Sequence, residues 1–240
     1  MSAVVQVEQR QPARLQIRAS HDRLAHMAED LPDVVERWVR AVELGVLGSG
    51  EGAAPAVAEL VEQSDDGPDR NWVLRVDKLQ WSALTVLVNM LRARYDNVYV
   101  ASRSGLVDRA ARLAFEALGF PRALDDLPFQ VDKEEPTRAS KNRGVLLSLR
   151  SPPDDSLADE MIAALDLWAE LIVCGGYAEP GSEPAKSLAV PDWAVLYDEV
   201  SVSQSFSEGF FADEAAFDAV LDYARALYLR GVPVVSVQFH

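Results

Sequence analysis

The segment Ser102-Arg103-Ser104-Gly105 is the place where this sequence could bind an anion. It follows the run NVYVA, which predicts a strand, and precedes residues 106–118, which predict a helix. Backbone N–H groups at the start of a helix attract anions, and Arg103 would add a positive charge. A serine-capped turn between a strand and a helix is the simpler interpretation. The segment has neither the spacing of a P-loop nor that of a Rossmann turn.

The predicted helix after this segment resembles part of a known enzyme family. Its sequence, DRAARLAFEALGF, has an alanine, an aromatic residue and a terminal Gly-Phe at spacings similar to those in the late strand–helix segment of acetyl-CoA-dependent acetyltransferases. That family's pyrophosphate-binding loop contains glycines, and the matching stretch here, DKLQWSALTV, contains none. The resemblance covers about a tenth of the chain. It implies an alternative function, an enzyme or ligand sensor with a degenerate acetyltransferase-like or phosphate-binding site at residues 102–105.

Residues for covalent or metal chemistry are scarce elsewhere. Cys174, the one cysteine, follows a predicted helix, whose C-terminal end raises a thiol pKa and makes the thiol a poor nucleophile. Three histidines and one cysteine are too few for the common Cys/His zinc sites. The acidic pairs Asp154-Asp155 and Asp198-Glu199 are more typical of a helix cap and a hairpin turn than of a metal site. We therefore expect no metal and no cofactor, and we favour a protein without enzymatic activity.

Negative charge is concentrated near the end of the sequence. The formal net charge is −15; residues 151–240 contain 16 Asp and Glu against 3 Lys and Arg, whereas residues 1–150 contain 22 against 20. An acidic surface repels phosphate backbones and attracts basic proteins, so nucleic-acid binding is disfavoured. Solubility alone is the plainer explanation.

The charge asymmetry leads to a hypothesis about function. We expect a binding protein of the inhibitor or immunity type that contacts a basic partner protein, with a structural or assembly protein as a further alternative. The acidic residues expected to contact the partner lie on two predicted helices: Asp159, Asp166, Glu170, Asp218 and Asp222.

The composition favours a water-soluble, cytoplasmic protein with no membrane partner. No apolar run reaches the ~18 residues that span a bilayer. The N-terminal residues lack the apolar core of a secretory signal, and a single cysteine fits a reducing compartment. Hydrophobic residues make up 49% of the chain and charged residues 25%, the balance of a folded globular protein.

Apolar periodicity divides the chain into four regions. Helical spacing over residues 20–46, interrupted at Pro32, and a short helix over 56–63 predict a helical beginning. The predicted regions are a helical N-terminal region at 1–70, a β-α-β-α unit at 71–132, a linker or mobile loop at 133–143, and a β-α-β-β-α-β unit at 144–240 that could be continuous with 71–132.

The last region determines the predicted fold class. Its element order matches the ferredoxin-like pattern. We predict an α+β fold with mixed sheets and packed helices, in which the C-terminal part is ferredoxin-like and the chain forms two related halves without a visible sequence repeat; a three-layer α/β fold is the alternative. Trp168 and Phe217 recur with their apolar neighbours at helical spacing, so both are expected in the core.

Overall fold

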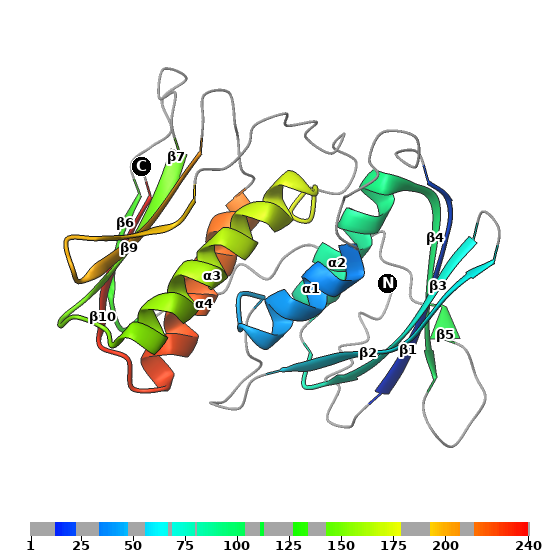
Figure 1. Ribbon diagram of the computed structural model, residues 1–240, viewed down its shortest axis with the longest axis horizontal. Helices are drawn as coiled ribbons and strands as arrows, with labels where there is room; N and C mark the ends of the chain where they lie inside the picture. The colour runs from blue at the N-terminus through cyan, green and yellow to red at the C-terminus, as the bar shows by residue number, and fades with distance from the viewer. Residues whose placement is uncertain are drawn as a thin grey trace, which may run out of the picture.

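Two five-stranded sheets lie on opposite sides of four helices in the computed structural model of the chain (Figure 1). The predicted α+β class is confirmed. The structure describes the following residues: 13–22, 34–47, 56–66, 69–79, 81–103, 111–112, 127–133, 143–178, 193–206 and 214–239.

The first sheet is antiparallel throughout and has the order β2-β3-β1-β4-β5. Alternation explains its central strand, because Leu15, Ile17 and Ala19 are buried and the residues between them face outward. The elements of this half are β1 (Ala13–Asp22), α1 (Val34–Glu43), β2 (Val57–Asp66), β3 (Asp69–Asp77), α2 (Trp81–Arg94), β4 (Tyr95–Arg103) and β5 (Ala111–Arg112).

The second sheet has the order β6-β10-β7-β9-β8, in which only the β6–β10 pair is parallel. Its elements are β6 (Gln130–Lys133), β7 (Arg143–Leu149), α3 (Asp155–Val173), β8 (Val195–Tyr197), β9 (Ser201–Phe206), α4 (Glu214–Leu229) and β10 (Val234–Phe239). From β7 onward, the elements follow the predicted β-α-β-β-α-β order. The ferredoxin-like assignment of this part stays a prediction.

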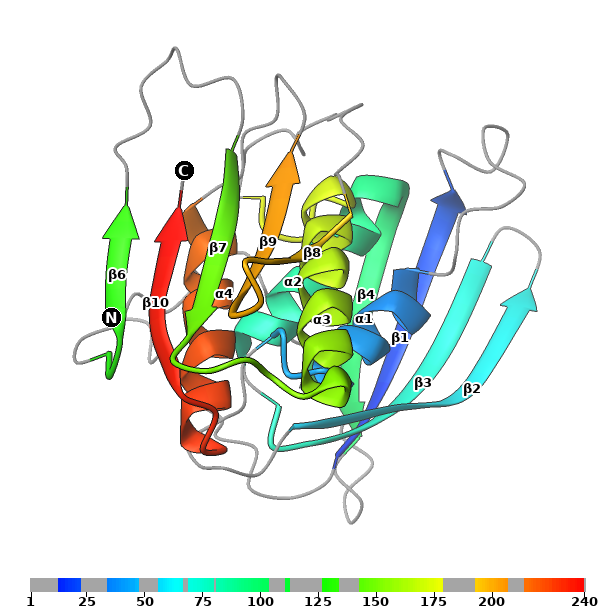
Figure 2. The ribbon, with the colours of Figure 1, turned by 60° about the vertical axis from the view of Figure 1, so that its left-hand side comes forward.

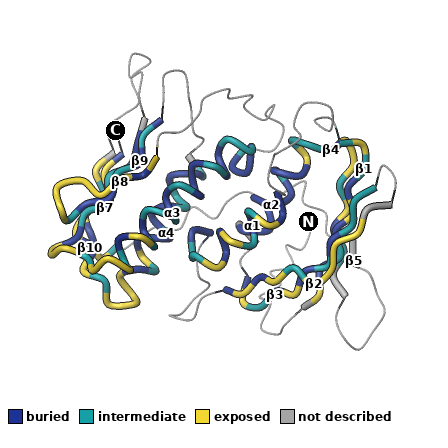
Figure 3. The backbone as a smooth tube through the Cα atoms, in the orientation of Figure 1, coloured by how far each residue is buried: buried dark blue, intermediate teal, exposed yellow. Residues whose placement is uncertain are grey.

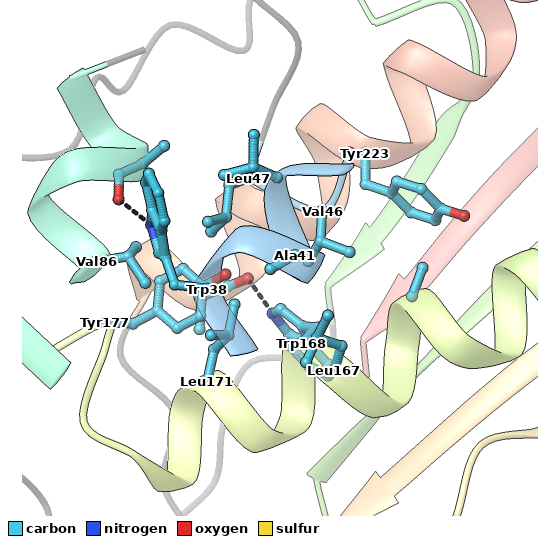
Figure 4. Packing of buried hydrophobic residues seen from close by; sticks show 14 of the residues in the cluster. Trp38, Ala41, Val46, Leu47, Val86, Leu167, Trp168, Leu171, Tyr177 and Tyr223 are labelled. Carbon is cyan, nitrogen blue, oxygen red and sulfur yellow. Dashed lines mark hydrogen bonds between the residues drawn. The ribbon is translucent and has the colours of Figure 1, made fainter. Parts of the chain in front are cut away.

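The two halves share one structural plan. Both run β-α-β-β-α-β, and the neighbour order β2-β3-β1-β4 of the first matches β8-β9-β7-β10 of the second. One indole bond also recurs: Trp38 Nε1 of α1 donates to Ala83 O at 2.7 Å, and Trp168 Nε1 of α3 donates to Ala216 O at 2.8 Å (Figure 4). Both alanines are the third residue of the second helix of their half.

The helices of the two halves meet in the middle of the molecule, which gives a sheet–helix–helix–sheet arrangement (Figures 1 and 2). α1 contacts α3, and Arg37 Nε lies 3.0 Å from Glu170 Oε2 across this junction. The Asn89 amide on α2 donates to Gly176 O at 3.1 Å and to Ala178 O at 3.0 Å. These bonds join α2 to the turn that follows α3, so the halves are linked by polar as well as apolar contacts.

Gly176 packs against α2 of the first half, and we expect Gly176→Ala to destabilise the protein by about 1–3 kcal/mol. A Cβ atom there would lie 2.8 Å from Val86 Cγ1, 3.0 Å from Leu171 O and 3.2 Å from Met90 Cγ. Denaturant midpoints measure the loss. Adding Val86→Ala should recover part of it, because the nearest clashing atom is removed; a double variant as unstable as the sum of both single variants would contradict this account.

Several predicted helices are strands. Residues 20–22 belong to β1, the predicted helix at 56–63 is most of β2, and the predicted helix at 106–118 contains β5. The predicted helical region 1–70 therefore contributes β1 and β2 to the same sheet as β3 and β4. The predicted linker at 133–143 begins with the last residue of β6 and ends with the first residue of β7. In each case strand pairing outweighs a local helical pattern, because a strand is stabilised by neighbours that are distant in sequence.

Other local predictions are confirmed. Asp154 caps α3, and its Oδ1 accepts from Leu157 N at 2.8 Å. Gly231 follows α4 with a φ of 91°, the left-handed conformation expected of a helix-ending glycine. Trp168 and Phe217 are both buried.

Candidate functional site

The predicted anion-binding segment lies at the end of a strand. Ser102 and Arg103 are the last residues of β4, where both pair with β1, and Ser102 also pairs with β5. Ser104 and Gly105 lie outside the described residues. The described backbone therefore offers a strand at Ser102 and Arg103 rather than a helix start, and β5 occupies part of the helix that was expected to supply the N–H donors.

The register gathers arginines on the first sheet. Arg103 of β4 lies opposite Arg14 of β1, which lies opposite Arg75 of β3. Arg75 Nη2 forms an ion pair with Glu59 Oε2 at 2.8 Å. These three arginines thus lie on strands of the first half, far in sequence from the acidic second half.

Three of the predicted partner-binding acids lie on α3, and two of them are engaged within the protein. Asp159 is exposed. Asp166 Oδ1 accepts from Ala194 N at 2.6 Å; burial raises the pKa of this carboxyl, and the hydrogen bond from Ala194 lowers it. Glu170 forms the ion pair with Arg37 described above. Asp166 therefore holds the chain just before β8, and Glu170 joins the two halves.

The other two predicted acids lie one turn apart on α4, and both are half-buried. Burial raises the pKa of Asp222 to about 6, against the lowering effect of Arg225; the charge of Asp218 raises it further. Burial also raises the pKa of Tyr177, with the charge of Asp222 as the second cause. Among the five predicted acids, Asp159 is the one that is fully exposed.

Cys174 is unsuited to nucleophilic chemistry, as predicted, although the main cause differs. Burial is the largest effect and raises the pKa of the thiol, while Arg37, whose Nη1 lies 3.0 Å from Sγ, lowers it. Among the described residues, no group of three or more His, Cys, Asp or Glu side chains could hold a metal ion. Within the same residues, no helix is long and apolar enough to cross a membrane.

The edge of the second sheet exposes a run of apolar side chains. β8 is the last strand in the order, and among the described strands it pairs with β9 alone. Trp193 is 80% exposed, and the exposed fractions of Val195, Leu196 and Tyr197 are 52%, 43% and 59%. Trp193, Val195 and Tyr197 alternate along the chain, so they share one face of the strand. We refer to residues 193–197 as the β8 edge.

Acidic side chains stand at both ends of the β8 edge. Asp166 bonds to Ala194 at its beginning, and the exposed Asp198 and Glu199 form the turn to β9 at its end. Asp198 and Glu199 have φ angles of 46° and 65°, the left-handed region that tight turns use. The predicted hairpin with solvated acidic residues is confirmed at this turn (yellow in Figure 3).

Strands β7 to β10 of the second sheet are nearly uncharged. They contain one charged residue, Arg143, whereas β6 at the far edge contains an aspartate and a lysine and α3 alone contains five acidic residues. Ser148 of β7 lies opposite Ser201 of β9, and their Oγ atoms are 2.9 Å apart. Ser201 in turn lies opposite Tyr197, so this uncharged face is continuous with the β8 edge.

Sequence reasoning selected the helical acids and missed the exposed residues of the β8 edge. The available signal was the alternation of Trp193, Val195 and Tyr197 before an acidic turn. Alternation identifies a strand and its two faces, but it does not say whether the apolar face is covered. That distinction depends on strand order, which places β8 at an edge.

No protein-family model matches this chain, and no curated protein matches it. Similar solved structures include an unknown protein from Galdieria sulphuraria, with 9% identity over 96% of this chain and 98% of that one and a TM-score of 0.21. A microcompartments protein from Desulfitobacterium hafniense DCB has 11% identity over 95% of this chain and 93% of that one, with a TM-score of 0.22. Such low TM-scores carry no argument about function.

Proposed function

We propose that this protein binds a basic partner protein through its acidic C-terminal half, in the manner of an inhibitor or immunity-type protein. The observation that carries the proposal is the charge asymmetry: residues 151–240 contain 16 acidic and 3 basic residues. One of those basic residues, Arg230, is already paired with Glu160 at 2.7 Å. Three basic residues can neutralise only a minority of the sixteen acidic charges in this half.

Electrostatic attraction of this kind acts mainly on the rate of association. Exposed charges are screened over ~8 Å at physiological ionic strength, so binding should weaken as salt increases. The described residues offer exposed carboxylates at Asp159 on α3 and at Asp198-Glu199 in the hairpin turn. Asp166 and Glu170 have structural contacts, so reversing their charge would also disturb folding.

The test is the association rate of a partner recovered from the native host by affinity capture. We expect Asp159→Lys combined with Glu199→Lys, which reverses two exposed charges, to slow association about tenfold at low salt and to reduce its salt dependence. Glu43→Lys combined with Glu62→Lys makes the same charge change at two exposed positions of the first half, so it is the matched control and should have a smaller effect. The proposal would be refuted by a partner whose association rate changes neither with salt concentration nor in the double variant of Asp159 and Glu199.

A further inference from the structure

We propose that the β8 edge is the docking site for an extended, basic segment of the partner, which adds to the second sheet as a further strand beside β8. This inference rests on the proposed function and specifies where and how the partner binds. An edge strand presents unpaired backbone N–H and C=O groups that another strand can bond.

Most features that protect sheet edges are missing from the β8 edge within the described part of the chain. Short strand length is one such feature, and β8 has it, with three residues. Inward-pointing charges, lysine or proline on the strand, and cover by another described strand are missing. Residues 193–197, WAVLY, contain no charge and no proline, and four of the five side chains are large, apolar and exposed. Trp193 and Tyr197 belong to the residue types that dominate binding energy at protein interfaces. The composition of this edge is therefore that of an interface centre.

The surroundings extend this surface. Protein interfaces have a centre depleted in charge and a polar rim. Here the centre is the β8 edge with the adjoining serine-rich face of β7 and β9, and the rim includes Asp198 and Glu199. Figure 2 shows β8 beside β9 at the margin of this sheet, with α3 nearby. An incoming strand would meet backbone groups, apolar side chains and carboxylates together.

Charge decides which occupant fits. The hairpin turn carries two carboxylates, those of Asp198 and Glu199. One basic residue is close to it in the chain trace, Arg150, because the preceding residue donates its N–H to Val200 O. A second copy of this chain would bring a further −15 of net charge to an acidic edge. A segment that alternates basic and apolar residues could pair with β8 without that repulsion. Its apolar side chains would cover Val195 and Tyr197, and its basic side chains would reach Asp198 and Glu199.

The probe for this inference is a short peptide that alternates lysine and valine. A glutamate–valine peptide of the same length controls for charge, and a lysine–proline peptide controls for strand formation, because proline removes backbone donors. Binding to the full chain is followed by calorimetry, and hydrogen exchange reports whether the amides of residues 195–197 become protected. We expect the lysine–valine peptide to bind at least about tenfold more tightly than either control.

Two variants of the β8 edge should each weaken binding of the lysine–valine peptide by about tenfold: Val195→Pro, and Trp193→Ala combined with Tyr197→Ala. The second variant keeps the backbone of β8, so it remains informative if Val195→Pro disturbs folding. Tyr228→Ala removes an exposed aromatic side chain from α4 and should leave affinity within about twofold of the parent. Denaturation midpoints confirm that the variants are folded.

The outcomes separate this inference from the proposed function. If both lysine peptides bind equally, and binding ignores the β8 variants, basic recognition survives and strand addition is overturned. If the lysine–valine peptide does not bind, docking at the β8 edge is overturned, and the captured partner's salt dependence alone decides the proposed function. Self-association that depends on concentration and disappears in the β8 variants would assign the edge to a second copy and overturn the basic occupant.

Discussion

Trp168→Ala should lower the free energy of unfolding by about 3–5 kcal/mol, the range for removing a large aromatic side chain from a packed core. Trp168 has no exposed surface. Its Nε1 donates to Ala216 O, and its ring packs edge-on against Phe206 of β9, with centroids 5.3 Å apart. The side chain thus joins α3 to both α4 and the sheet, and its loss leaves a cavity and removes the hydrogen bond to Ala216 O.

Urea denaturation of Trp168→Ala and Trp193→Ala gives a matched comparison, since Trp193 is mostly exposed. We expect Trp193→Ala to change stability by no more than about 0.5 kcal/mol. Phe217→Ala should also be strongly destabilising, because its ring packs against Phe239 with centroids 4.9 Å apart. Equal stability of Trp168→Ala and Trp193→Ala would contradict the burial of Trp168 and the exposure of Trp193.

The recurring indole bond predicts that Trp38→Ala will destabilise the protein in the same way as Trp168→Ala. Trp38 is as buried as Trp168 and makes the same bond to the third residue of the next helix. The sequence alone does not reveal this correspondence, because the two tryptophans occupy different positions along helices of different length. The related halves become evident only when the strand order is known, because the halves share a topology without a visible sequence repeat.

Local chemistry explains what could be predicted from the sequence. α3 was predictable because Asp154 caps its start and apolar residues recur along one face. The β8–β9 hairpin was predictable from the break in alternation at Asp198-Glu199. β2 was not, because VAELVEQSDD is rich in helix-forming residues and becomes a strand only by pairing with β3. β1 was missed because its last residues, 20–22, were assigned to the predicted helix at 20–46, and no strand was predicted before that helix.

The candidate site was also only partly predictable from the sequence. Charge asymmetry is a property of composition and was visible at once. Which acids are exposed is a property of packing, and it depends on contacts such as Arg37 with Glu170 that join distant parts of the chain. The β8 edge depends on strand order in addition, and strand order follows from long-range pairing that single-sequence patterns do not encode.

Asp222→Asn should make the protein more stable above about pH 6 by about 2 kcal/mol. Burial raises the pKa of Asp222 from 3.8 to about 6 in the folded state, so the folded protein holds this proton more tightly than the unfolded chain does. Below about pH 4 both states are protonated and the group has no effect on stability. As pH rises to about 6, the unfolded chain ionises first and stability is lost; at higher pH the loss is complete. The full shift corresponds to about 3 kcal/mol, and residual contact with solvent reduces it.

Urea denaturation of the parent protein and Asp222→Asn across this pH range tests the account. The difference in unfolding free energy should be near zero at pH 4, should grow up to about pH 6 and should then stay constant. Asp159→Asn neutralises an exposed carboxyl on α3 and should produce no comparable difference, because an exposed charge contributes little to stability. If Asp222→Asn were less stable at every pH, a favourable contact of the carboxylate would outweigh its burial. Under the proposed function, the basic partner would give this carboxylate a counter-charge, so the same substitution should weaken that partner's affinity while it stabilises the free protein.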